Sequence, residues 1–167
     1  LSLRRQRQMC IRDRSEESLI KFYKDEDQSF FSYDFKNHNL IKVDAISNYF
    51  ILFADLENQE INNKIIDKLK KYNSQKDYFF TTVNPKDKTF EETRYWRGPV
   101  WINSNWIVYQ GLINKDKIFS SLIKNKTLEL LENKKFHEYY NYKTGECLGA
   151  NNFSWSAALY LDFKLSN

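Results

Sequence analysis

The sequence predicts an all-α fold with one small β-hairpin. Glycine and proline are scarce, with 4 and 2 among 167 residues, and folds of many short strands need such residues at their frequent turns. Long segments instead repeat apolar residues at the three- and four-residue spacing of helices. With 41% hydrophobic and 17% aromatic residues, the chain has enough apolar surface to bury a packed core and is not expected to be disordered.

The first two predicted elements are a helix and the hairpin. Ser15 is expected to cap a helix that continues through Leu19 and Phe22 at helical spacing. Residues 30–35 and 40–43 alternate in a β pattern around the polar turn Lys36-Asn37-His38-Asn39, which predicts a hairpin.

Two further helices follow the hairpin. We expect Asp44 to cap a helix over residues 45–56, which is apolar on most of its circumference and is therefore predicted to be buried. Residues 58–72 carry only a narrow apolar stripe, so this helix is expected on the surface with its polar face in water.

The second half of the chain repeats the same alternation. Residues 74–94 look irregular, and Pro99 suits the first turn of a buried helix over 100–113. An amphipathic helix over 116–132 and a largely apolar one over 155–165 complete the chain. Such alternation fits a two-layered helical toroid and also fits a generic helical bundle, and periodicity alone does not choose between them.

The excess positive charge lies at the start of the chain. Residues 1–14 contain five Arg and one Asp, which leaves 21 basic and 21 acidic side chains in residues 15–167. The segment reads either as a basic arm for nucleic acid or a membrane, or as a stretch that is not native. We favour the second interpretation, because QMCIRDR resembles a translated sequencing adaptor and the segment lacks the Lys and Asn that dominate elsewhere.

Cysteine usage and hydropathy exclude several classes of protein. Outside residues 1–14 only Cys147 is present, so neither an internal disulfide nor a structural zinc site is expected. The longest apolar run, residues 49–54, is too short to cross a bilayer. We therefore expect no metal, no cofactor, no membrane or nucleic-acid partner, and a cytoplasmic location. Nothing in the pattern fixes an oligomeric state.

The first segment that suggests chemistry is RYWRGPVWINSNW, residues 94–106. It places three of the four Trp and the only two Arg of residues 15–167 where a loop enters a helix. Aromatic rings stack on the apolar faces of sugars, and amide and guanidinium groups bind hydroxyls. Asn105 on so apolar a helix needs a hydrogen-bond partner, which is either protein or ligand.

The second segment is FHEYYNYKTGECLGANNFSWSAALYLDF, residues 136–163. Glu138 lies among aromatic residues, and such surroundings tend to raise the pKa of a carboxyl group into a range that suits acid–base work. The alternative is an ordinary surface Glu before a turn. Residues 142–145 read as that turn, with Gly145 in a left-handed conformation.

Together, YWRGPVWINSNW and FHEYYNYKTGECLGANNFSWSAAL resemble the C-terminal part of glycoside hydrolase family 63 and its bacterial relatives, the mannosylglycerate and glucosylglycerate hydrolases. The resemblance covers about residues 30–165 and implies an (α/α)6 toroid, of which residues 15–167 would be the C-terminal part. It also implies hydrolysis of an α-glycosidic bond with inversion by a pair of carboxyl groups.

The resemblance also assigns residue roles. It places the general base at Glu138 and the aromatic lining of the sugar pocket at Tyr95, Trp96 and Trp101. Substrate-binding or supporting positions fall on Arg97, Asn105 and Trp155. The family's general acid is an Asp in an upstream motif that has no match here, so the chain is expected to be inactive alone.

Two other functions stay open at this point. A trehalase-like or oligosaccharide α-glucosidase would share the toroid and differ in its substrate. A non-catalytic carbohydrate-binding helical protein would keep the aromatic residues and lack the second carboxyl group. In each case the expected partner is a small sugar or glycoside.

Overall fold

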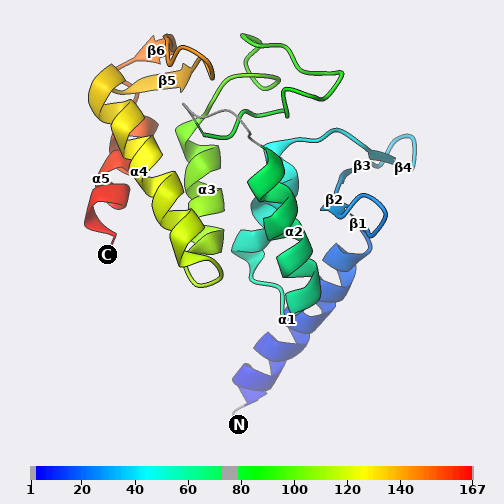
Figure 1. Ribbon diagram of the computed structural model, residues 1–167. Helices are drawn as coiled ribbons and strands as arrows, with labels where there is room; N and C mark the ends of the chain where they lie inside the picture. Colours follow the sequence, from blue (N-terminus) through cyan, green and yellow to red (C-terminus); the bar gives the residue numbers. More distant parts are fainter. Residues whose placement is uncertain (1–2, 73–78, 167) are drawn as a thin grey trace.

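The computed structural model describes the backbone of residues 3–72 and 79–166, and side chains from residue 7 onward. About half of the chain is helical, and the described residues also form three small antiparallel strand pairs (Figure 1). The helices are α1 Leu3–Ile20, the 3-10 helix η1 Ile46–Ala54, α2 Gln59–Tyr72, α3 Ile102–Leu112, α4 Lys117–Lys134 and α5 Ser154–Leu165. The strands are β1 Tyr23–Lys24, β2 Ser29–Phe30, β3 Ser32–Asp34, β4 Asn39–Ile41, β5 His137–Tyr140 and β6 Cys147–Asn151.

The first helix does not begin where the sequence predicted. Ser15 lies inside α1, and its hydroxyl donates to the carbonyl oxygen of Ile11 at 2.8 Å. A serine can satisfy its hydroxyl in this way within a helix, so its presence alone does not mark a helix start. The interpretation of residues 1–14 as non-native stays a prediction.

The predicted hairpin is confirmed, and two others were missed. Strands β3 and β4 pair antiparallel with Tyr33 opposite Leu40. Strands β1 and β2 form a second pair and β5 and β6 a third, so the expectation of a single hairpin is wrong. Their aromatic and polar residues lack a clean alternation, which explains why the pattern did not reveal them.

The segment predicted as a buried helix over 45–56 is a 3-10 helix, and Asp44 does not cap it. The carboxylate of Asp44 instead accepts hydrogen bonds from Asn84 Nδ2 at 2.7 Å and from the Tyr49 hydroxyl at 3.3 Å. The reason is tertiary, because the neighbouring Ala45 forms an isolated β-bridge with Val83 that holds this stretch extended. The predicted burial is correct for one face of η1, where Tyr49 and Leu52 pack in the core.

Helix α3 lies at the centre of the molecule, but Pro99 is not in its first turn. Val100 forms β-bridges to Thr81 and Tyr140, so the chain is still extended there and the helix begins at Ile102. A Cβ added at Gly111 would lie 2.7 Å from the carbonyl carbon of Leu52, so the backbones of α3 and η1 approach closely.

Helix α4 is confirmed, whereas α5 is less buried than predicted. Asp116 caps α4 by accepting a hydrogen bond from the Phe119 backbone N–H at 3.0 Å. On α5, Trp155, Leu161 and Leu165 are 54%, 59% and 80% exposed. Apolar composition alone therefore misassigned this helix, because only one of its faces packs against α3 and α4.

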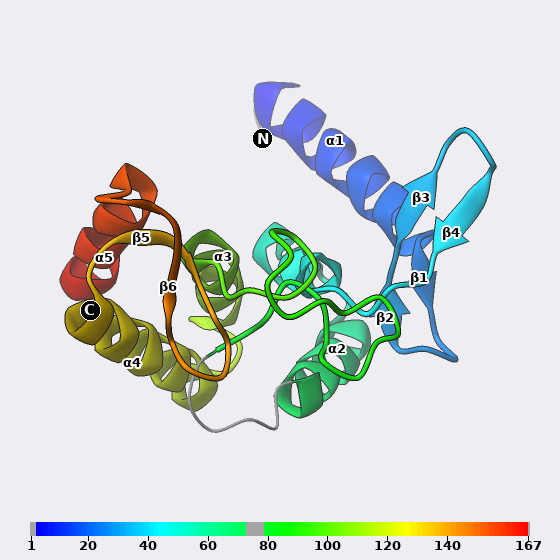
Figure 2. The same cartoon turned by 90° about the horizontal axis from the view of Figure 1, so that it is seen from above.

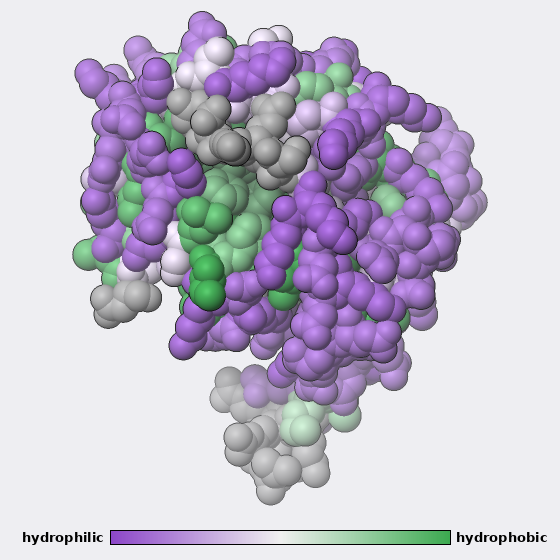
Figure 3. All heavy atoms as spheres, in the orientation of Figure 1, coloured by the Kyte–Doolittle hydropathy of each residue, from purple (hydrophilic) through white to green (hydrophobic). Residues whose placement is uncertain are grey.

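The arrangement of these elements brings the two chemistry-bearing segments to one end of the molecule. Helix α3 lies between α4 and η1, and α2 packs on η1. The loop of residues 79–101 and the β5–β6 hairpin lie over the ends of these helices (Figures 1 and 2). Figure 3 shows hydrophilic side chains around an apolar area between α4 and α2. None of the helices in the described part of the chain is long and apolar enough to cross a bilayer.

Candidate active site

Two backbone hydrogen bonds join the segments that the sequence singled out. The Val100 N–H donates to the carbonyl of Tyr140 at 2.8 Å, and the Tyr140 N–H donates back to Val100 at 3.0 Å. The loop before α3 therefore runs beside strand β5, which carries Glu138. The bridge between Val100 and Tyr140 thus brings side chains of the loop, such as Tyr95, close to side chains of the strand, such as Glu138.

Glu138 is held at both carboxylate oxygens. Its Oε1 accepts a hydrogen bond from the Tyr95 hydroxyl, and its Oε2 accepts one from the backbone N–H of Ala150 at 3.1 Å. These two donors favour the ionised form and lower the pKa of Glu138 below its usual value, with the Tyr95 bond as the larger cause. The sequence-based expectation of a raised pKa is therefore wrong, because the hydrogen bonds from Tyr95 and Ala150 outweigh the smaller effect of desolvation on Glu138.

Gly149 leaves the room that this arrangement needs. It has a positive φ of 71°, and an added Cβ would lie 2.5 Å from Glu138 Oε2 and 2.6 Å from Tyr139 Cε1. A side chain at this position would be strained by the backbone and would also push on the carboxylate.

Three stacked rings lie beside the carboxylate. Trp101 stacks on Trp96 with centroids 4.1 Å apart and on Tyr139 with centroids 5.1 Å apart. Tyr95 packs edge-on against all three rings. Trp101 is buried, and Trp96 is 50% exposed, so Trp96 offers an open aromatic surface beside Tyr95, the residue that donates to Glu138.

Arg97 and Asn105 both make protein contacts. The guanidinium of Arg97 donates to Glu91 Oε1 at 2.9 Å. Asn105 is fully buried, where it accepts from the Phe80 N–H at 3.1 Å and donates to the Trp101 carbonyl at 2.8 Å. The hydrogen-bond partner that Asn105 was expected to need is thus the protein backbone. Its two bonds tie Phe80 and Trp101, at the two ends of the loop, to α3.

Trp155 lies in the first turn of α5, where its ring meets Phe153 edge-on with centroids 6.0 Å apart. In the described part of the chain it makes no ring contact with the stack of Trp96, Trp101 and Tyr139. The sequence reasoning missed Tyr139, Gly149 and Ala150. Tyr139 stood inside the motif, but only the β5–β6 pairing shows that residues 149 and 150 lie against Glu138.

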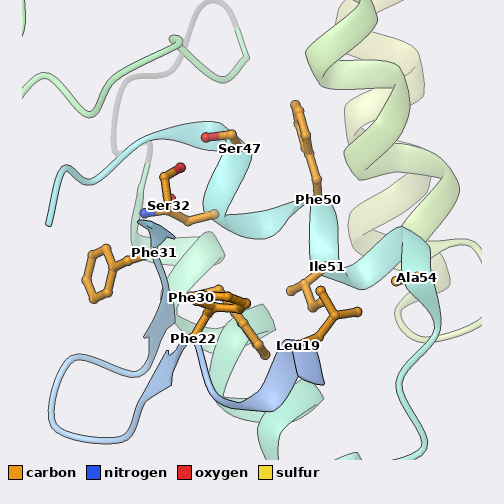
Figure 4. A pocket seen from close by; sticks show the side chains of 10 residues that line it. Leu19, Phe22, Phe30, Phe31, Ser32, Ser47, Phe50, Ile51 and Ala54 are labelled. Carbon is orange, nitrogen blue, oxygen red and sulfur yellow. The ribbon is translucent and has the colours of Figure 1, made fainter. Parts of the chain in front are cut away.

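A separate hollow lies away from these residues. It has a volume of about 330 Å³ and opens between α1, β2 and η1 (Figure 4). Phe22, Phe30, Phe50 and Ile51 form most of its wall, and the hydroxyls of Ser32 and Ser47 lie at its edge. In the described residues, no group of three or more His, Cys, Asp or Glu is placed to hold a metal ion.

Comparison with known proteins decides the family. The domain described as "Mannosylglycerate hydrolase MGH1-like glycoside hydrolase domain" matches residues 11–156. The chain belongs to this family. The match includes the loop with Tyr95 and Trp96 and the strand with Glu138, and it places the chain among the glycoside hydrolase family 63 proteins that the two motifs resembled.

Relatives within this family are bacterial and plant hydrolases. The mannosylglycerate hydrolase of Thermus thermophilus is 37% identical over 135 residues, which are 79% of this chain and 32% of that protein. The chain thus spans about a third of that relative's length. A crystal structure of the family 63 mannosylglycerate hydrolase from Thermus thermophilus, in complex with Tris and D-glycerate, superposes with a TM-score of 0.85 at 34% identity, over 92% of this chain and 37% of the other.

The fold extends to a more distant protein. Neutral trehalase from Saccharomyces cerevisiae matches with a TM-score of 0.67 at 18% identity, over 91% of this chain and 29% of that one. At this identity the likeness concerns the fold alone.

Proposed function

We propose that Glu138 is the general base of an inverting glycoside hydrolase and that this chain is the C-terminal part of its catalytic domain. The observation that carries the proposal is the Glu138 carboxylate, which accepts hydrogen bonds from Ala150 and from Tyr95, whose ring packs against the exposed ring of Trp96. A general base must be ionised before it can accept a proton, so a lowered pKa suits this role and would not suit a general acid.

In the proposed reaction, Glu138 accepts a proton from a water molecule as that water attacks the anomeric carbon. A second carboxylic acid protonates the leaving oxygen, and in inverting enzymes the two groups stand about 6.5–9.5 Å apart. The two donors to Glu138 fix the direction of its remaining lone pairs, which orients the water. The second acid would come from an upstream part of the protein, in a domain that we propose is an (α/α)6 toroid.

The substrate we propose is a small α-mannoside or α-glucoside, such as mannosylglycerate or glucosylglycerate. Support comes from the 37% identity to a mannosylglycerate hydrolase and from the exposed ring of Trp96, on which the apolar face of a hexose can stack. Tyr95, which we expected to line the sugar pocket, has its hydroxyl engaged by Glu138 and would contribute its ring edge. A location in the cytoplasm belongs to the same proposal.

The test uses the full-length protein that carries this chain. Sugar release from mannosylglycerate, glucosylglycerate, trehalose and longer α-glucosides is compared for the wild type and for Glu138→Gln, which keeps the shape and removes the base. We expect turnover of a glycerate glycoside, with kcat of Glu138→Gln reduced by about 10³-fold or more and KM little changed.

Two outcomes would change the conclusion. Turnover of trehalose or an oligosaccharide alone would keep the mechanism and replace the substrate. Binding of sugar by both proteins without hydrolysis by either would make the Trp96 surface a binding platform and remove the enzymatic function.

A further inference from the structure

The hydrogen bond between Tyr95 and Glu138 joins two segments that are far apart in the sequence. Tyr95 lies on the loop before α3, and Glu138 lies on strand β5. The bond forms only if the loop keeps its position relative to the strand. On the C-terminal side of the loop, the two backbone hydrogen bonds between Val100 and Tyr140 fix the position of the loop relative to strand β5.

Glu92 holds the N-terminal side of the same loop. Its Oε1 accepts a hydrogen bond from Asn141 Nδ2 at 3.0 Å, and its Oε2 accepts one from Lys143 Nζ at 3.0 Å. Both partners lie in the turn that follows β5, so one carboxylate spans the gap between the loop and the hairpin.

The bond to Asn141 matters more than the ion pair. Asn141 is 5% exposed, and its Oδ1 already accepts the N–H groups of Lys143 and Thr144 in the turn. Its buried Nδ2 would lose its acceptor without Glu92, and an unsatisfied buried donor is costly. The side chain of Lys143 is 51% exposed, and an ion pair so open to water contributes little.

Between its two anchors the loop is closed on itself. The backbone N–H of Glu91 donates to the carbonyl of Arg97 at 3.0 Å, and the Glu91 carboxylate accepts from the guanidinium groups of Arg94 and Arg97. A closed loop moves as a unit, so a displacement at Glu92 would be passed on to Tyr95.

We propose that Glu92 is a positioning residue, which ties the loop to the turn of Asn141 and Lys143 and thereby holds the Tyr95 hydroxyl against the Glu138 carboxylate. The inference rests on the proposed role of Glu138 as the general base. The groups that face Glu138 are Tyr95 from the loop, the N–H of Ala150 from β6 and the neighbouring ring of Tyr139. Of these contacts, the hydrogen bond from Tyr95 is the largest cause of the lowered pKa of Glu138.

The experiment compares Glu92→Ala and Glu92→Gln in the full-length protein, with Asp25→Ala as a matched control. Asp25 accepts a hydrogen bond from Lys64 across two segments in the same way, but on the β1–β2 side of the molecule, away from Glu138 (Figure 1). The readouts are kcat, KM, the pH dependence of kcat/KM, and the pKa of Glu138 from carboxyl ¹³C NMR, assigned with Glu138→Gln.

We expect Glu92→Ala to lower kcat by about 10- to 100-fold with little change in KM, since small misplacements of catalytic groups have effects of this size. The acid limb of kcat/KM and the NMR pKa of Glu138 should both move to higher pH. Glu92→Gln should recover part of each effect, because its amide oxygen can still accept from Asn141. Asp25→Ala should match the wild type in all readouts.

The proposal is overturned if Glu92→Ala lowers only the melting temperature and leaves the NMR pKa of Glu138 unchanged. If Glu92→Ala does not fold, Glu92→Asp replaces it, because it keeps the charge and is too short to reach both partners. Glu92→Asp must then show the same rise in the NMR pKa of Glu138 and in the acid limb of kcat/KM. The NMR titration needs no turnover, so a wild type without hydrolase activity would refute the proposed function and still test the positioning by Glu92.

Discussion

Gly149 lies directly against the carboxylate of Glu138. A methyl group added at this glycine would be 2.5 Å from Glu138 Oε2. The next residue of strand β6, Ala150, donates its backbone N–H to the same oxygen. The geometry of the proposed base is thus set by a residue that carries no functional group.

Gly149→Ala should disturb the base without changing its chemistry. The added methyl group clashes with the carboxylate, and the φ of 71° is unfavourable for alanine, so we expect kcat to fall by about 10²-fold. The measurement is steady-state kinetics on the full-length protein, with Gly145→Ala as a control for strain, since Gly145 also has a positive φ of 63°. Equal losses in both variants would show that backbone strain, and not contact with Glu138, is responsible.

Tyr95→Phe should shift the pH dependence of the reaction. The hydroxyl of Tyr95 is the largest cause that lowers the pKa of Glu138, so its removal should raise that pKa toward the ordinary value of about 4.3. Activity depends on the ionised base and is lost as the pH falls through its pKa, so the acid limb of kcat/KM should move to higher pH. An acid limb that stays in place would contradict the hydrogen bond as the cause.

Gly111→Ala should destabilise the fold, although alanine is normally the better residue in a helix. The new methyl group would meet the backbone of Leu52 at 2.7 Å, and overpacking of this kind costs about 1–3 kcal/mol, more than the helix propensity returns. Urea unfolding checks this, with the exposed Ser121→Ala on α4 as a control that should be neutral or slightly stabilising. A higher midpoint for Gly111→Ala would show that α3 and η1 can separate without loss.

Asp116→Ala should weaken α4 from its first turn. The Asp116 carboxylate accepts the Phe119 N–H and forms an ion pair with Lys70 at 2.8 Å. Loss of such a cap costs about 0.5–2 kcal/mol. Since hydrogen bonds to Lys70 and Phe119 lower its pKa, the contribution should be present at neutral pH and decline as the pH falls through the lowered pKa. Asp116→Asn keeps the cap and should retain most of the stability.

The sequence was informative where a local pattern reports directly on structure. The β3–β4 hairpin followed from its polar turn, α2 from its apolar stripe, α4 from its amphipathic pattern, and the left-handed Gly145 from its turn. In each of these elements the signal and the structure involve the same few residues.

The errors arose where a distant segment decides the outcome. The capping expected from Asp44 fails because the chain beside it pairs with residues 83 and 84, and the helix expected from Pro99 fails because Val100 pairs with Tyr140. The burial expected for α5 fails because composition does not state how many neighbours a helix has.

The sequence by itself determined that helices outnumber strands and showed the two motifs, whose family resemblance makes Glu138 the candidate base. Only the tertiary structure decided the state of that base, because its pKa depends on Tyr95, 43 residues away, and on a backbone N–H from the next strand. Amino-acid composition suggested an apolar environment that would raise the pKa. The folded chain instead brings two hydrogen-bond donors to the carboxylate, and donors stabilise its charge.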